Sequence, residues 1–215
     1  ALRALRDRCE TPRARRVALL LLAVTVASLS WSGLVVVHPL HQSYDGVYFA
    51  RSIEAVRASL ARYGELPFWN PYECGGVPLW DNPQSLAASP ILLPLLPLGG
   101  EGALRAWHVL HAALGFLSMW VLARRELSLG LAGSLLASVT WAIGGFHWQH
   151  ATIGHASFAS FQYLPLALYL SRRAEKRWTC AVLLGALLAN ILFEGGTYPA
   201  PFLGGYVRRS LPLFS

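Results

Sequence analysis

Long apolar blocks alternate along the chain with short clusters of basic residues. Residues 17–37 contain no charged side chain, and about 20 apolar residues are enough to cross a bilayer as a helix. Similar blocks follow at residues 103–123, 127–146, 156–171 and 178–193. The fourth is short and contains Pro165, which membrane helices tolerate. The pattern predicts an all-α, polytopic integral membrane protein with about five transmembrane helices.

The basic clusters set the predicted orientation. They precede the first block, follow the second and follow the fourth, at Arg13, Arg15, Arg16, Arg124, Arg125, Arg172, Arg173, Lys176 and Arg177. Positive charge gathers on the cytoplasmic side of membrane proteins, so residues 1–16 form a cytoplasmic tail and residues 38–102 an outer loop. The alternative for the first block is a cleaved signal peptide, but the apolar region of a signal peptide is shorter, at about 7–15 residues.

The outer loop begins with a predicted amphipathic helix. Phe49, Ile53, Val56 and Leu60 are spaced four, three and four residues apart, which makes one apolar stripe. Gly64 is a natural C-terminal stop for this helix. The helix could lie flat on the membrane surface or pack on neighbouring helices, and the sequence alone leaves both open.

The second half of the loop, residues 65–100, holds seven of the 13 prolines. Proline fixes φ and removes a donor, so neither regular helix nor sheet is expected there. Phe68, Trp69, Tyr72 and Trp80 are costly to leave in water. We therefore expect an ordered loop packed on the outer membrane face.

Composition narrows the class of protein. The chain is 54% hydrophobic and 13% charged, whereas soluble domains carry about 25% charged residues. The net charge of +7 is spread over separate clusters, which argues against nucleic acid as a partner. Cys9, Cys74 and Cys180 fall in three different predicted segments, so neither a disulfide framework nor a cysteine zinc site is expected. The domains expected are the tail (1–16), one membrane domain (17–203) and a truncated tail (204–215), because the chain begins at Ala1 and stops soon after an apolar block.

Two acidic residues are candidates for chemistry. Asp45 follows the first block by about eight residues, and a carboxylate there can accept a proton or bind a divalent cation. Its alternative role is to cap the loop helix. Glu194 lies at the end of an apolar block, where an ionisable group is a functional candidate unless water already solvates it.

All seven histidines fall in segments assigned to the outer half of the chain: His38, His41, His108, His111, His147, His150 and His155. The pairs 108/111 and 147/150 have the i, i+3 spacing that can present two imidazoles to a metal ion. Binding of a phosphate headgroup, or no special role, is equally compatible with the pattern. The tryptophans on this side fit an interfacial belt or stacking on sugar rings. P-loop, GxGxxG and GxSxG motifs are absent from the sequence, which argues against ATPases, Rossmann enzymes and α/β-hydrolases.

The strings LPFWNPY (66–72), GGVPL (75–79) and DNPQ (81–84) resemble the first outer loop of the bacterial YfhO-like membrane proteins. The later strings YLPL (163–166) and EGGTYP (194–199) resemble a second block of that family, although TYP stands where the family usually has a form close to GGHPQ. The resemblance covers about residues 17–203. These proteins are similar to the GT-C glycosyltransferases, polytopic enzymes that take sugars from polyprenyl-phosphate carriers.

The resemblance implies roles for particular residues. An acidic residue just after the first span is the typical catalytic or metal-linked position, and Asp45 matches it, which leaves room for a divalent cation nearby. Arg51 and the outer histidines would neutralise the donor phosphate. The Gly75–Gly76 pair would let the backbone approach the substrate closely. The expected substrate-binding residues are Tyr48, Arg51, Trp69, Asn70, Tyr72, Gly75, Gly76, Trp80, Asp81, His155 and Glu194.

The function expected is transfer of a sugar from a polyprenyl-phosphate carrier to a glycan, lipid or protein acceptor, on the outer face of the bacterial inner membrane. The alternatives are a transporter or flippase of lipid-linked glycans and a non-catalytic membrane subunit. A transporter would be expected to carry ionisable groups within its spans.

Overall fold

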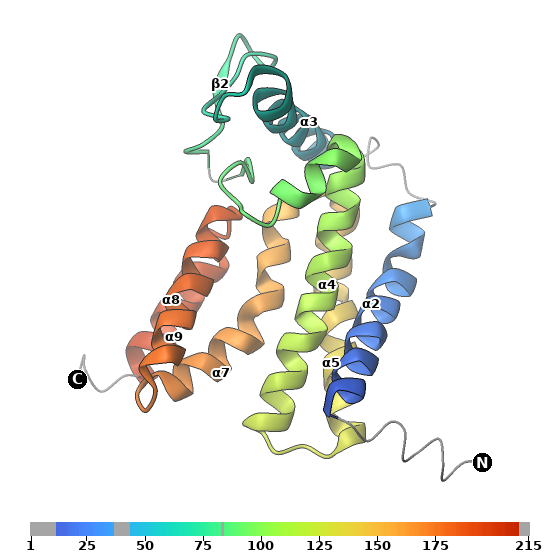
Figure 1. Cartoon of the computed structure of the whole chain (residues 1–215), viewed down its shortest axis with the longest axis vertical. Helices are drawn as coiled ribbons and strands as arrows, with labels where there is room; N and C mark the ends of the chain where they lie inside the picture. The colour runs from blue at the N-terminus through green and yellow to red at the C-terminus, as the bar shows by residue number, and fades with distance from the viewer. Residues whose placement is uncertain (1–11, 37–43, 83, 211–215) are drawn as a thin grey trace.

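The computed structural model describes residues 12–36, 44–82 and 84–210, and these residues are mostly helical (Figure 1). The elements run in the order α2 (Pro12–Val36), α3 (Tyr44–Ala58), a π-helical turn η2 (Ser59–Tyr63), β1 (Trp69–Asn70), β2 (Val77–Pro78), η3 (Leu93–Leu98), α4 (Gly99–Arg125), α5 (Leu131–Ile143), α6 (Gly145–Ile153), η4 (Ala156–Tyr163), α7 (Leu164–Ala174), α8 (Trp178–Phe193) and α9 (Pro199–Ser210). The all-α prediction is confirmed at this level, apart from the two short strands.

Helix α4 is the centre of the molecule. It contacts α2, α3, α5, η4 and α7, while α7 and α8 pack beside it as a second group (Figure 1). Its fully buried side chains include Leu104, Trp107 and Phe116. Burying a large apolar side chain contributes about 1.5–3 kcal/mol, so these three side chains stabilise the packing of α4 in the core.

Helix α3 caps one end of the bundle, as Figure 1 shows. Its predicted stripe is buried at Phe49, Ile53 and Val56 and partly buried at Leu60, and it joins the core built on α4. The stripe therefore packs on a neighbouring helix, which was one of the two alternatives. The chain leaves this segment at Gly64, whose left-handed φ of 67° ends the π-helical turn as predicted.

The start of α4 docks directly against α3. The Gly100 amide donates to Glu54 Oε2 at 3.1 Å, and a Cβ built on Gly100 would lie 2.2 Å from the Ala50 carbonyl oxygen. Only a residue without a side chain permits this approach of the two backbones.

The proline-rich half of the loop is ordered, but the prediction that it contains no sheet was wrong. Trp69–Asn70 and Val77–Pro78 pair as an antiparallel two-residue hairpin, so the segment is not wholly irregular. Leu79, Leu86 and Leu92 anchor the loop by burial, whereas Phe68, Trp69, Tyr72 and Trp80 remain 44–64% exposed. The aromatic side chains are therefore presented outward from the loop rather than used to fold it.

The predicted spans correspond to helices with different boundaries. The second lies inside α4 and the fifth coincides with α8. The third is broken at Gly144 into α5 and α6, and the fourth begins as the 3₁₀ helix η4 before Pro165 starts α7. Helix α2 begins at Pro12, within the predicted amino-terminal tail, and α9 continues to Ser210, within the predicted carboxyl-terminal tail. Cys9, His38 and His41 lie outside the described residues.

One helix in the described part of the chain, Leu93–Arg125, is long and apolar enough by itself to cross a membrane. Arg16–Leu29 and Trp178–Phe193 are apolar but shorter. The number of spans therefore stays a prediction.

Two basic turns meet at the end of the bundle opposite α3. Arg172 and Arg173, in the last turn of α7, lie 3.5 and 3.6 Å from Glu126, which follows α4. Arg173 also donates to the Arg125 carbonyl oxygen. The clusters that the sequence assigned to one side of a membrane therefore lie together.

We predict that Gly100→Ala lowers the stability of the folded protein by about 1–3 kcal/mol, because the new methyl group meets the Ala50 backbone. Gly185→Ala is the matched control: it lies within α8 with nothing within 4 Å of the added Cβ, and helix propensity favours it by up to about 1 kcal/mol. Thermal unfolding of the purified variants measures both. Equal midpoints for the two variants would show that the contact between α3 and α4 is not tight.

Candidate functional site

Asp45 forms the outermost part of the candidate site. It is the second residue of α3, and its Oδ2 lies 2.7 Å from Nε2 of His155. The two side chains are 39% and 30% exposed, so solvent or a substrate can reach the pair. Asp45 lies in the first turn, where a carboxylate is also favoured by the helix dipole. Asp45 thus contacts a second ionisable group, His155. A residue that only caps a helix does not need such a contact.

A second imidazole continues this contact inward. His150 Nδ1 lies 2.8 Å from His155 Nδ1, and the His150 ring stacks on Phe158 with centroids 3.8 Å apart. Since Asp45 accepts from His155 Nε2–H, neutral His155 has a bare Nδ1 that accepts from His150 Nδ1–H. Asp45, His155 and His150 therefore form one ordered hydrogen-bonded row.

Histidines from three segments surround a small cavity of about 10 Å³, which we call the histidine cavity. Its polar lining is His108 and His111 from α4, His147 and His150 from α6, His155, and Gln162 from η4. Burial lowers the pKa of His147 to about 4 and also lowers the pKa of His150, and a neighbouring histidine adds to each shift. Both imidazoles are therefore neutral at pH 7, so each offers one donor and one acceptor.

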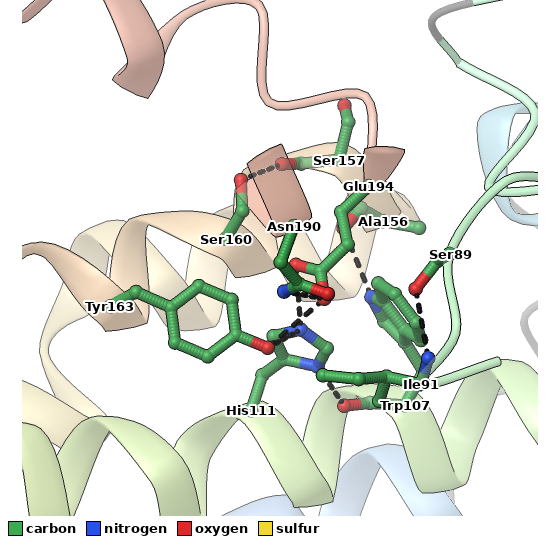
Figure 2. Close-up of polar contacts among 10 residues, drawn as sticks. All are labelled: Ser89, Ile91, Trp107, His111, Ala156, Ser157, Ser160, Tyr163, Asn190 and Glu194. Carbon is green, nitrogen blue, oxygen red and sulfur yellow. Dashed lines mark hydrogen bonds and ion pairs between the residues drawn. The ribbon is translucent and has the colours of Figure 1, made fainter. Parts of the chain in front are cut away.

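A second polar cluster, which we call the Glu194 cluster, includes His111 together with Tyr163, Asn190 and Glu194 (Figure 2). Glu194 is fully buried. Its Oε2 lies 3.1 Å from His111 Nε2, and its Oε1 accepts from the Tyr163 hydroxyl at 3.0 Å and from Asn190 Nδ2 at 2.8 Å. The Tyr163 hydroxyl also lies 2.9 Å from His111 Nε2. Burying a carboxyl group at this depth costs free energy unless the group is hydrogen-bonded, and here both of its oxygens have hydrogen-bonding partners.

The hydrogen bonds fix how many protons this cluster holds. His111 Nδ1 lies 2.8 Å from the Trp107 carbonyl oxygen, and a carbonyl only accepts, so Nδ1 carries a proton. The contact between His111 Nε2 and Glu194 Oε2 then needs another proton, on either atom. The cluster is therefore neutral overall, as an ion pair or as a neutral acid and base sharing one proton.

Three of the predicted substrate-binding residues line a separate and larger cavity of about 460 Å³. This outer cavity lies between α3 and the hairpin, and its polar lining is Arg51, Glu54, Arg62, Asn70, Tyr72 and Glu73. Asn70 is buried, and its side chain accepts from the Tyr72 amide at 3.0 Å. The Tyr72 hydroxyl lies 2.8 Å from that of Tyr63, a bond that raises the pKa of Tyr72. These hydrogen bonds hold the wall of the outer cavity in place before any ligand binds. The wall presents both polar groups and aromatic rings.

The acidic and the basic side chains that line the outer cavity are not equally available to a ligand. Glu54 is bonded to Arg57, which lowers its pKa. Asn70 Nδ2 lies 3.4 Å from Glu73 Oε2. Arg51 and Arg62 contribute two positive charges, and Arg62 lies over the Tyr63 ring. A ligand with an anionic group and a polar ring would meet complementary chemistry there.

Other predicted residues have structural tasks instead. Trp69 lies against Gly76, where a Cβ would come within 2.4 Å of the indole, and Gly75 and Gly76 have φ of 79° and 116°. Gly76 therefore makes room for Trp69, whereas nothing lies within 4 Å of a Cβ built on Gly75. The prediction that the pair lets the backbone approach a substrate stays a prediction. Trp80 packs on Phe68, and the Tyr48 hydroxyl accepts from Asn82. Asp81 is exposed on the loop.

The sequence did not point to His111, Tyr163 or Asn190 as partners of Glu194. His111 and Glu194 are separated by 83 positions, and only the i, i+4 spacing of Asn190 and Glu194 within one helix was a local signal. In the described residues, no group of three or more histidine, cysteine, aspartate or glutamate side chains is arranged to hold a metal ion. The predicted cation near Asp45 therefore stays a prediction.

Comparisons with known proteins found no matching family model, no matching curated protein and no matching solved structure.

We predict that Glu194→Gln is tolerated to within about 1 kcal/mol, whereas Glu194→Ala costs about 3 kcal/mol or more. Glutamine at this position still accepts from Tyr163 and Asn190 and donates to His111 Nε2. Alanine leaves all three groups buried without their partner. Thermal unfolding of the two purified variants separates these cases. A glutamine variant as unstable as the alanine variant would mean that the buried pair depends on a full negative charge.

Proposed function

We propose that the chain is part of a GT-C-like membrane glycosyltransferase that moves a sugar from a polyprenyl-phosphate carrier to a cell-envelope acceptor at the outer face of the bacterial inner membrane. The observation that carries this proposal is the partly exposed pair of Asp45 and His155, at the start of the helix whose later residue Arg51 lines the outer cavity. The membrane setting and the chemistry are supported separately.

The outward surface of the helices supports a lipid environment. Large apolar side chains that are more than a third exposed run along α2, α5 and α8, namely Val17, Leu20, Leu21, Leu22, Val24, Leu29, Leu131, Leu136, Trp178, Val182, Leu183, Leu192 and Phe193. Exposed apolar side chains in this number mark contact with membrane or protein. In lipid these side chains meet a solvent as apolar as themselves.

The helix lengths are compatible with a bilayer. At about 1.5 Å per residue, the 25 residues of α2 and the 27 residues of α4 extend for about 38 and 40 Å. Both exceed the hydrocarbon thickness of about 30 Å. Helix α8, with 16 residues, extends for about 24 Å, so it would need local thinning or snorkelling at its ends.

The placement of charge favours one orientation. Arg124, Arg125, Arg172 and Arg173 lie at the end of the bundle opposite α3. If this end faces the cytoplasm, as the positive-inside rule expects, Asp45, the outer cavity and the histidine cavity all face the outside. Lipid-linked sugars would then reach them from the outer leaflet.

In the proposed reaction Asp45 is the general base. Its carboxylate accepts the proton of an acceptor hydroxyl as that oxygen attacks the anomeric carbon of the sugar. The new bond is carbon to acceptor oxygen, and the bond that breaks joins the anomeric carbon to a donor phosphate oxygen, which leaves with the electron pair. Arg51 and Arg62 are placed to stabilise the leaving phosphate, and Tyr72 offers a ring for the sugar to stack on.

His155 positions the base. Its Nε2–H donates to one oxygen of Asp45, which leaves the other oxygen for the acceptor. Asp45 and Arg51 are six residues apart on one helix, about 9 Å along its axis, and at 100° per residue their side chains leave the axis about 120° apart. A substrate that meets both would therefore have to lie around the helix as well as along it.

A transporter of lipid-linked glycans is the second candidate, and the buried Glu194 cluster favours it. An ionisable group enclosed within a bundle of apolar helices is characteristic of proton- and ion-coupled transport. Such a protein would depend on Glu194, whereas the transferase depends first on Asp45.

We expect Asp45→Asn to reduce sugar transfer by about a hundredfold or more, the typical contribution of a general base. The assay uses membranes containing the protein and a panel of radiolabelled polyprenyl-phosphate sugars. Glu65→Gln is the matched control, because Glu65 is an exposed carboxylate of the same loop that lines neither the outer cavity nor the histidine cavity, and this variant should retain activity.

Transfer that survives in Asp45→Asn at equal expression would remove Asp45 from the reaction. A wild-type protein that transfers no sugar from the panel, but moves a lipid-linked glycan across the bilayer in a Glu194-dependent way, would establish the transporter instead.

A further inference from the structure

The outer cavity is lined by opposite charges that do not pair with one another. Arg51 and Arg62 line it from α3 and the η2 turn, and Glu73 lines it from the hairpin. Within the part of the chain that the structure describes, neither arginine has an ion pair, and Glu73 has none either. The cavity of about 460 Å³ therefore keeps two guanidinium groups apart from a carboxylate.

The other acidic side chains near Arg51 are already neutralised. Arg51 also lines a neighbouring cavity of about 350 Å³, together with Glu54 and Glu101. Each of these two carboxylates pairs with an arginine of its own helix. Among the described residues, Glu73 is thus the one acidic side chain that lines either cavity without an ion pair.

We propose that the outer cavity binds a zwitterion, a phosphate ester that carries a primary ammonium group, with the phosphate at Arg51 and Arg62 and the ammonium at Glu73. The inference deepens the proposed function and rests on it for the use of this cavity as the donor site, where the ligand is an amino sugar phosphate. An ethanolamine phospholipid headgroup carries the same two charges and is the other source of this chemistry.

The basic side of the cavity suits the phosphate. The N–H groups of a guanidinium form a planar fork that matches two phosphate oxygens. Arg51 has no hydrogen bond to another described residue that a ligand would have to break. Arg62 lies over the Tyr63 ring, a cation–π contact that holds its guanidinium at the cavity wall.

The hairpin side of the cavity suits the ammonium group. Asn70 is buried, accepts from the Tyr72 amide and places its Nδ2 3.4 Å from Glu73 Oε2. These contacts hold the carboxylate at the cavity wall. Tyr72 precedes Glu73 and is 64% exposed, so its ring can meet a cation. A carboxylate next to an exposed aromatic ring favours a cation over a neutral hydroxyl or amide.

A neutral sugar phosphate fits this lining less well. Glu73 would then share the cavity with the donor phosphate, and two negative charges repel each other. An ammonium group on the sugar removes this repulsion and adds a charge-assisted hydrogen bond. The unpaired carboxylate therefore distinguishes an amino sugar from a neutral one.

The test is isothermal titration calorimetry at pH 7 on the purified chain in maltoside micelles, with glucosamine 1-phosphate and N-acetylglucosamine 1-phosphate as probes. Acetylation removes the positive charge and keeps the sugar and the phosphate. The wild type should bind glucosamine 1-phosphate at least about tenfold more tightly, the effect of one charge-assisted hydrogen bond. Glu73→Gln should bind both probes equally, and Arg51→Gln should weaken both by at least about tenfold.

Glu65→Gln is again the matched control, because Glu65 is exposed on the same loop and lines neither of the two cavities. This variant should keep the wild-type preference. Equal affinity of the wild type for the two probes, a preference that survives in Glu73→Gln, or no binding of either probe overturns the zwitterion.

Glycerophosphoethanolamine is the third probe and separates the two sources. Tighter binding of glucosamine 1-phosphate supports the zwitterion as an amino sugar donor, and tighter binding of glycerophosphoethanolamine supports it as a lipid headgroup. The titration needs no sugar transfer, so its result is separate from the effect of Asp45→Asn. A chain that transfers neutral sugars and shows no preference between the first two probes keeps the proposed function and overturns only this inference.

Discussion

The hydrogen bond between the buried carboxyl group of Glu194 and His111 constrains how the helices meet in the half of the bundle nearer α3. A charge or an unpaired acid at this depth would cost several kcal/mol. The cluster therefore requires α4, the end of η4 and α8 to meet at one point. Once these elements are fixed, the break at Gly144 places α6 against η4, and the histidines of three segments surround one cavity.

Asp45 and Glu194 show how one functional group takes two roles according to its surroundings. Asp45 is partly exposed, and its carboxylate contacts the imidazole of His155. Glu194 has no contact with solvent and three hydrogen-bonding partners. The first is suited to meet a substrate hydroxyl, and the second is suited to hold a proton in reserve.

Local patterns predicted the elements well where one periodicity decided the structure. The stripe of α3, the stop at Gly64 and the limits of α8 follow from spacing and from one glycine. The break at Gly144 was missed because an apolar run hides it, and the two-residue hairpin was missed because the prolines around it argued against a sheet. The site could be predicted only in part, because His111 and Glu194, or Asp45 and His155, meet through the fold and not through the sequence spacing.

The account requires the histidine end of the bundle to face outward across a membrane. Cys74 tests this directly, because it is exposed on the loop, whereas Cys180 lies partly buried on α8. A membrane-impermeant thiol reagent added to intact spheroplasts should modify Cys74, and Cys74→Ser should abolish that labelling. Modification of Cys74 only after the membrane is permeabilised would place the candidate site in the cytoplasm and contradict the proposed reaction at the outer face.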